Sequence, residues 1–254
     1  MNTGPTHRPL PDDPALATLG KEVRSAVALG WQRRARNELS TSTVFADLTR
    51  SLVGIAAPHA LVLQAAAAVA DEVRHAEICL HVARAYWPEC PPPDPSPVAP
   101  ALRTAPGDGA ELATVLYVVL QSCLNEGVAS AYLQRCLTEA TSPLARAAVR
   151  DILEDEIHHA RLGWSLLASS TMHAQWRSDV AEALPTLLER VADAWTADDE
   201  DHLPHAPAGH GTIASREMAG VVRGAYEELI LPGFDRVGVD SRRARAWWAG
   251  RSWS

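Results

Sequence analysis

Residues 71–75 read DEVRH and residues 155–159 read DEIHH, so one five-residue pattern occurs twice in the chain. Each copy lies within a long stretch of helix-forming residues. Because residues three apart on an α-helix are separated by about 60° around the axis and ~4.5 Å along it, the Glu and the His of each copy lie on one face. Both side chains of a copy can therefore reach one point beside their helix.

Prolines and turn residues divide the surrounding sequence into helices. Asp13-Pro14 and Ser142-Pro143 each place a capping residue before a proline, an arrangement that favours a helix start. The proline-rich segment 88–107 is unsuited to helix or central strand. The predicted helices cover about residues 13–51, 59–87, 108–140 and 142–170, with further helices at about 173–197 and 212–231.

This order of helices predicts an all-α fold. Two helix pairs with short turns, joined by one long connection, form a four-helix bundle with one long crossover, which is the ferritin-like arrangement. We expect residues 1–12 to form a flexible N-terminal arm, residues 13–170 to form the bundle, and residues 171–254 to supply additional C-terminal helices packed on it. No stretch shows the convincing period-two alternation of a half-buried strand.

The two helices without the five-residue pattern each offer a glutamate at a matching level. Glu38 and Glu72 lie 16 and 14 residues from the turn between the first two helices. Glu126 and Glu156 lie 15 and 13 residues from the turn between the last two. Mostly apolar neighbours one and two turns away predict that Glu72, Glu126 and Glu156 face the core, whereas the face of Glu38 also carries polar residues.

Four buried glutamates require positive charge. Each ionised carboxylate would cost several kcal/mol inside an apolar bundle unless it is compensated. Two divalent cations would balance the four acids, and one neutral imidazole could complete each ion's ligands. Oxygen-rich ligation with one imidazole per ion suits iron or manganese, and no thiolate partner indicates a zinc site. The expected metal ligands are Glu38, Glu72, His75, Glu126, Glu156 and His159.

The order E, D-E-x-R-H, E, D-E-x-x-H over about residues 30–165 resembles the ferritin-like dinuclear carboxylate superfamily of non-haem di-iron proteins. The superfamily includes di-iron monooxygenases and hydroxylases, ribonucleotide reductase small subunits, acyl-carrier desaturases, rubrerythrins and manganese catalases. The resemblance implies a centre of two iron ions, with manganese as the alternative metal. The doubled motif is specific to the superfamily but not to one reaction.

The resemblance also implies a set of residues behind the ligands. In the superfamily, the Asp before each Glu hydrogen-bonds the ligand histidine of the other helix pair. By that resemblance Asp71 orients His159, Asp155 orients His75, and Arg74 pairs with this carboxylate network. The second copy of the pattern departs from the first, because a histidine stands at position 158 where the first copy has an arginine.

Several positions bear on the reaction that the resemblance implies. Ser130 lies four residues after Glu126, where di-iron monooxygenases carry a hydroxyl residue beside the oxygen-binding face. The resemblance therefore implies a catalytic role for Ser130 in proton delivery. The ordinary alternative is a serine whose hydroxyl bonds to its own helix. Cys79 stands where ribonucleotide reductase small subunits carry a radical tyrosine. Ile152 stands where aryl-amine N-oxygenases carry an additional histidine.

We therefore expect a non-haem di-iron oxygenase or hydroxylase, an oxidoreductase of the monooxygenase type. It would activate O₂ to oxidise a small organic substrate by C–H hydroxylation or amine N-oxygenation, in a setting such as secondary metabolism, and would draw electrons from an external ferredoxin or reductase. A manganese catalase or peroxidase-like enzyme and an iron-handling ferritin-like protein are the alternatives, and a degenerate bundle used for interaction is the non-metal alternative.

Composition sets the remaining expectations. The 254 residues include 23 Lys plus Arg against 31 Asp plus Glu, a formal net charge of -8, which gives no reason to expect nucleic-acid binding. The four cysteines form no C-x-x-C pair. No stretch approaches the roughly 20 apolar residues of a membrane span, and the first residues lack the layout of a signal peptide. We expect a cytoplasmic protein that does not bind a membrane. The formation of a homodimer is an open alternative.

Two C-terminal features have an ordinary and a functional interpretation. The acidic loop 198–211 carries three histidines; a solvated loop is the default, and a lid or adventitious metal site is the alternative. The Arg- and Trp-bearing tail is expected to pack its indoles on the bundle, with docking of a partner or an anionic carrier as the alternative. The histidines of the loop are His202, His205 and His210, and the tryptophans of the tail are Trp247, Trp248 and Trp253.

Overall fold

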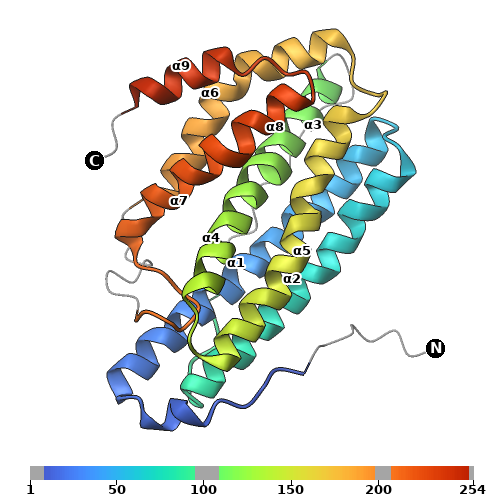
Figure 1. Cartoon of the computed structure of the whole chain (residues 1–254). Helices are drawn as coiled ribbons and strands as arrows, with labels where there is room; N and C mark the ends of the chain where they lie inside the picture. The colour runs from blue at the N-terminus through green and yellow to red at the C-terminus, as the bar shows by residue number, and fades with distance from the viewer. Residues whose placement is uncertain (1–8, 95–108, 198–206, 252–254) are drawn as a thin grey trace, which may run out of the picture.

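The computed structural model describes residues 9–94, 109–197 and 207–251, and every regular element within these ranges is helical (Figure 1). The prediction of an all-α chain is therefore confirmed for the described residues. The N-terminal arm falls mostly outside them, as does the larger part of the long connection predicted at 88–107.

The first two long helices form a hairpin, α1 (Lys21–Gly54) and α2 (His59–Tyr86). A helix does begin at Pro14 with Asp13 at the N-cap position, as predicted, but it is the short 3₁₀ helix η1 (Pro14–Thr18), and the long helix α1 begins only after Gly20. Asp13 makes no capping hydrogen bond with its side chain; its Oδ2 instead accepts a hydrogen bond of 2.5 Å from the hydroxyl of Ser142.

The third predicted helix is one run of three segments. It begins as α3 (Ala110–Val118), widens into a π-helical segment, η2 (Val119–Asn125), and continues as α4 (Glu126–Glu139). The next helix, α5 (Pro143–Ala168), starts where the sequence predicts, because the hydroxyl of Ser142 accepts a hydrogen bond of 3.2 Å from the amide of Ala145.

The long helices pack side by side (Figure 1). In addition to the α1–α2 hairpin, α5 packs against α2, α4 and η2, and α1 contacts α3. The two copies of the five-residue pattern, on α2 and α5, therefore belong to neighbouring helices.

A second group of helices covers one side of these four. α6 (Ala174–Thr196) packs on α3 and η2, and α7 (Met218–Gly224) packs on α4. The helix predicted from residue 212 begins only after the 3₁₀ turn η3 (Ser215–Glu217), because residues 209–213 are held against the first four helices, as described below. The remaining segments are the π-helical η4 (Ala225–Ile230), α8 (Leu231–Arg236) and α9 (Arg242–Gly250).

The Arg- and Trp-bearing tail lies partly in α9. The indole of Trp248 is buried, and its Nε1 donates a hydrogen bond of 3.1 Å to Glu227. Arg251 pairs with Asp193 of α6 at 2.5 Å and lies 5.5 Å above the ring of Trp247. These contacts agree with the expectation that the tail packs its indoles on the fold, whereas Trp253 lies outside the described residues.

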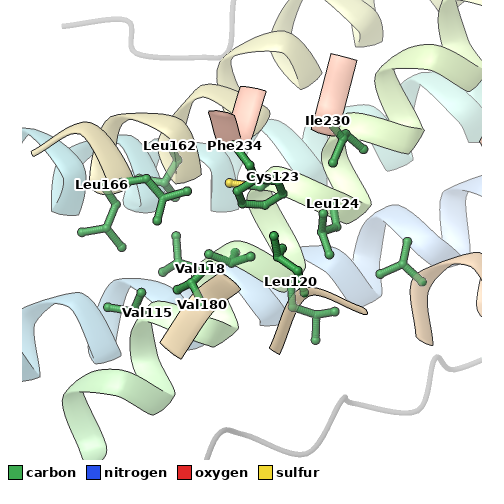
Figure 2. Packing of buried hydrophobic residues seen from close by; sticks show 14 of the residues in the cluster. Val115, Val118, Leu120, Cys123, Leu124, Leu162, Leu166, Val180, Ile230 and Phe234 are labelled. Carbon is green, nitrogen blue, oxygen red and sulfur yellow. The ribbon is translucent and has the colours of Figure 1, made fainter. Parts of the chain in front are cut away.

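The apolar interior consists of two clusters of buried side chains. The larger one joins α3, η2, α5, α6 and α8, and Figure 2 shows Val118, Leu166, Val180 and Phe234 pointing into it. The smaller one gathers around Trp31 and other side chains of α1, α2 and α5 nearer to the start of α1. Along α1, α2 and α5 a polar region separates the two clusters, and the predicted metal ligands lie in it.

One helical run, Ala110–Glu139, is long and apolar enough to cross a membrane when judged by length and composition alone. This qualifies the expectation that no stretch approaches such a span. An 18-residue window of the run is 61% buried inside the fold, and the run contains Glu126. Burial of that extent is typical of the core helix of a globular fold.

Candidate metal centre

The six predicted ligands come from α1, α2, α4 and α5 and lie together inside the fold. Their donor atoms form two overlapping groups, and within each group all donor atoms lie within 4.8 Å of one another. All of these residues except Glu38 are at most 5% exposed. One group comprises Glu38, Glu72, His75 and Glu156, and the other comprises Glu72, Glu126, Glu156 and His159.

Glu72 and Glu156 belong to both groups. The oxygens of Glu72 lie 3.1 Å from Nδ1 of His159 and 3.6 Å from Nδ1 of His75. The oxygens of Glu156 lie 3.2 Å and 3.4 Å from the same two nitrogens. Each of these carboxylates turns one oxygen toward each histidine, which is the geometry needed to bridge two ions. Glu38 and Glu126 each belong to one group only and would each serve one ion.

Glu126 follows the π-helical segment directly. A π turn contains more residues than an α turn, so it changes the face toward which the following side chains point, and such segments are frequent at functional sites. Helix α5 approaches η2 very closely at Gly163, where an added Cβ would lie 2.4 Å from Sγ of Cys123. A glycine on α5 and a widened turn before α4 therefore bring the two helices together next to the ligands.

Several polar atoms of the cluster are buried without a hydrogen-bond partner. Among the described residues, neither oxygen of Glu72 nor Nδ1 of His75 has one, although the two residues lie close together. An unpaired buried polar atom costs about 1–3 kcal/mol, and more when it is charged. Bound cations would turn these atoms into ligands, so the cluster fits divalent metal ions. The donor set does not by itself select the metal.

Most ionisable groups of the metal-free cluster have a raised pKa and so retain protons; Glu156 is the exception, because hydrogen bonds from His159 and His75 outweigh its burial and lower its pKa. Burial raises the pKa of Glu38 and of Glu126 well above the usual value, and neighbouring carboxylates raise it further. Burial lowers the pKa of His75, but the carboxylates of Glu156 and Glu72 outweigh it and raise the pKa to about 10. Protons thus hold the acids together in the metal-free protein, and metal binding must displace them.

Asp71 and Asp155 lie on the other side of the two histidines. Oδ2 of Asp155 lies 3.2 Å from Nε2 of His75, and Oδ2 of Asp71 lies 3.4 Å from Nε2 of His159. A hydrogen bond donated by Nε2 fixes the tautomer whose Nδ1 is free to bind a metal. The contacts cross between the two helix pairs, as the resemblance implied.

Arg74 contacts two carboxylates rather than one. It forms ion pairs with Asp155 and, at 3.2 Å, with Asp151. The sequence analysis missed Asp151, although its position one turn before Asp155 on α5 is a signal that could have indicated it. His158, which takes the place of the arginine in the second copy, is exposed, with its Nδ1 3.5 Å from Arg161, and does not contact this network.

Ser130 and Cys79 lie near the cluster without joining it. The hydroxyl of Ser130 is buried and has no hydrogen-bond partner among the described residues, so it does not bond to its own helix. Ser130 also does not line the cavity described next, and its catalytic role stays a prediction. Cys79 is fully buried, and burial raises the pKa of its thiol, as expected for a small core residue.

A cavity of about 630 Å³ borders the cluster. All four glutamate ligands line it, together with Arg34 of α1, Tyr132 of α4 and Trp195 of α6. The volume lies in the range of small-molecule sites. The sequence analysis did not identify these three residues. The position of Arg34 one turn before Glu38 on the same helix face is a signal, but nothing local places α6 beside α4.

Residues 207–213 cross the fold next to this cavity, and Thr212 and Ile213 line it. Nε1 of Trp31 donates a hydrogen bond of 2.9 Å to the carbonyl of His210, whose ring lies 2.9 Å from the hydroxyl of Tyr86. Gly211 has φ +78°, and an added Cβ would lie 2.5 Å from the indole of Trp31. The expectation of a solvated loop is therefore wrong at His210, whereas His202 and His205 lie outside the described residues.

Comparison with models of known protein families finds no match for this chain, and comparison with curated proteins finds none either.

Proposed function

We propose that the chain is a ferritin-like non-haem di-iron oxygenase or hydroxylase that oxidises a small organic substrate with O₂. One observation carries the proposal: the cavity of about 630 Å³ is lined by all four of the buried glutamates that could hold two ions. A storage site for iron has no need of an organic cavity beside its ligands. A cavity with acids along one side and aromatic residues along the other suits a substrate that is oxidised where it meets the metals.

The order and packing of the helices support the superfamily assignment. α1, α2, α4 and α5 contribute Glu, Glu-x-x-His, Glu and Glu-x-x-His in that order, which matches the pattern of ferritin-like carboxylate proteins. The long connection between α2 and α3 is the predicted crossover, and most of it lies outside the described residues.

Within this proposal each side chain has a defined task. Glu38, Glu72, His75 and Glu156 would hold one ion, and Glu72, Glu126, Glu156 and His159 would hold a second. Two iron ions held there would supply the redox chemistry toward O₂. Asp71 and Asp155 keep both imidazoles oriented toward the acids.

The walls of the cavity complete the site. Leu133, Ile213 and Met218 line it and supply apolar surface close to the acids. Electrons would come from an external ferredoxin or reductase.

The proposal is tested on protein purified with iron. We expect two irons per chain, antiferromagnetically coupled in Mössbauer spectra after exposure to oxygen, and O₂ uptake that depends on a reductant and a substrate. Protein that folds but binds no metal would contradict the proposal. Vigorous oxygen release from H₂O₂ by manganese-loaded protein would favour a catalase, and a large shell containing many irons per chain would favour iron handling.

A further inference from the structure

Arg34 is held in one orientation in the wall of the cavity. One terminal nitrogen, Nη2, donates hydrogen bonds of 2.6 Å to the hydroxyl of Tyr132 and 2.9 Å to the carbonyl of Gly211. The guanidinium carbon lies 4.5 Å from the ring centre of Trp31 and 5.1 Å from that of Tyr132. Two rings and two acceptors therefore fix the plane of the guanidinium group.

The other terminal nitrogen of Arg34 makes no hydrogen bond to an oxygen in the described part of the chain, although the arginine also interacts with the thiol of Cys136. Nη1 is buried and has no hydrogen-bond partner in the described part of the chain, and no carboxylate of that part lies within 4.0 Å of the Arg34 side-chain nitrogens. An arginine stays charged in a protein, so the two N–H groups of Nη1 carry positive charge without an acceptor. A buried charged donor without a partner costs more than the about 1–3 kcal/mol of a neutral one.

Charge balance indicates what the missing acceptor is. Two divalent ions would neutralise the four glutamates, which leaves the charge of Arg34 uncompensated on the cavity wall. Arg34 lies four residues before Glu38, about 6 Å along α1, and both line the cavity, so a ligand held by the guanidinium group would extend toward the acids. A planar carboxylate matches the fixed guanidinium plane and carries one negative charge.

We propose that the substrate is a small organic carboxylate whose carboxylate group accepts hydrogen bonds from the guanidinium group of Arg34, which lines the cavity. Its apolar part lies along Tyr132 and Trp195, whose ring centres are 5.9 Å apart, and ends at the four glutamates. The substrate assignment rests on the proposed function, because the carboxylate anchor positions the rest of the molecule for oxidation. The anion site at Arg34 is a property of the chain by itself.

Binding of matched acid and amide pairs tests this site. Benzoate against benzamide, hexanoate against hexanamide and indole-3-acetate against its amide are titrated by calorimetry into zinc-loaded and metal-free protein, neither of which turns over. We expect the acid of at least one pair to bind at least tenfold more tightly than its amide. We expect Arg34→Met to abolish that preference, whereas Arg150→Met, at an exposed position on α5, keeps it.

The outcomes separate the two proposals. Acid preference that survives Arg34→Met in zinc-loaded protein would mean that the carboxylates bind the metal, and would overturn the anchor. Equal binding of acids and amides would overturn it as well, and so would tighter binding of phenyl phosphate than of any carboxylate. If Arg34→Met does not fold, Arg34→Lys is measured in its place. Lysine lacks the planar guanidinium group, so the preference for acid over amide should fall at least threefold. Failure of zinc to bind, with acid preference intact in metal-free protein, would refute only the proposed function.

Discussion

Two parts of the same interior differ in what holds them together. In the apolar core of Figure 2, Leu166 and Phe234 are fully buried among other apolar side chains and need no ligand. Two to three turns earlier on α5 than Leu166, His159 and Glu156 are almost equally buried, yet the cluster around them contains polar atoms without partners. Burial stabilises the first region directly, whereas the second region is stabilised only when charge of the opposite sign is supplied.

The difference teaches that burial alone does not indicate what a residue contributes. Removing an apolar side chain should destabilise the chain equally with and without metal. Removing a ligand should affect mainly the metal-loaded protein, because the metal-free cluster already contains unpaired acids. Five measurements test this contrast.

The largest effect on metal binding is expected for Glu156→Ala, because Glu156 belongs to both ligand groups. We expect metal content to fall from two ions per chain to one or fewer. Metal at 100 times its Kd stabilises a folded protein by about 2.7 kcal/mol, and the variant should lose this stabilisation. Elemental analysis and unfolding with and without chelator measure both effects. Glu154→Ala, at an exposed position on the same helix, is the control and should change neither.

On the apolar side, Phe234→Ala should lower the free energy of unfolding by about 3–5 kcal/mol, because it leaves a cavity in a packed core. The ring of Phe234 lies 5.0 Å from that of Trp164, so near-ultraviolet circular dichroism should change as well. Denaturant titrations should give the same loss in metal-free and metal-loaded protein. A loss found only in the loaded protein would contradict the distinction between the two regions.

Gly163→Ala tests the place where the regions meet. An added Cβ would lie 2.4 Å from Sγ of Cys123 and 3.0 Å from its backbone nitrogen, so η2 has to move. We expect destabilisation of about 1–3 kcal/mol from overpacking. Because η2 leads into Glu126, metal content should fall too. Gly220→Ala, where an added Cβ meets nothing within 4 Å, is the control.

Asp155→Asn should weaken metal binding about 10–100-fold while two ions still bind at saturation. The oxygen of the amide can still accept from Nε2 of His75, but the amide has no negative charge to strengthen that hydrogen bond or to pair with Arg74. Competition with a chromophoric chelator measures the affinity. Unchanged affinity would show that His75 needs no carboxylate behind it.

The last test varies the pH. The pKa of His75 is raised from 6.5 to about 10 in the metal-free fold, so its stabilising contribution is complete below pH 6.5 and is lost as the pH rises through 10. Metal affinity should change in the opposite direction and increase with pH, because the imidazole must release its proton to bind. Unfolding midpoints of metal-free protein from pH 6 to pH 10 should therefore fall, and those of loaded protein should fall less.

Local spacing allowed the sequence to predict much of this. The i, i+3 positions of Glu72 with His75 and of Glu156 with His159 follow from helix geometry, and equal distances from the turns placed Glu38 and Glu126 at the same level. The start of α5 at Pro143 follows from a capping serine. Each of these inferences uses residues that are close in sequence and share one helical element.

Other features depend on contacts between distant segments. Asp13 looked like a helix cap, but its carboxylate binds Ser142. His210 looked like part of a solvated loop, but Trp31 and Tyr86 hold it against the fold. The sharing of Glu72 and Glu156 between two ligand groups, and the cavity beside Arg34, could not be predicted, because they depend on how helices approach one another.

The sequence by itself determined that the chain is helical and which acids and histidines lie at one level, since the period of a helix and the position of a turn are local properties. Only the tertiary structure decided which carboxylates lie between the histidines, which carboxylates Arg74 pairs with, and that one nitrogen of Arg34 is left without an acceptor. Those features are set by the packing of α4, α5 and residues 209–213 against α1 and α2, and packing is determined by the shapes of all the buried side chains together.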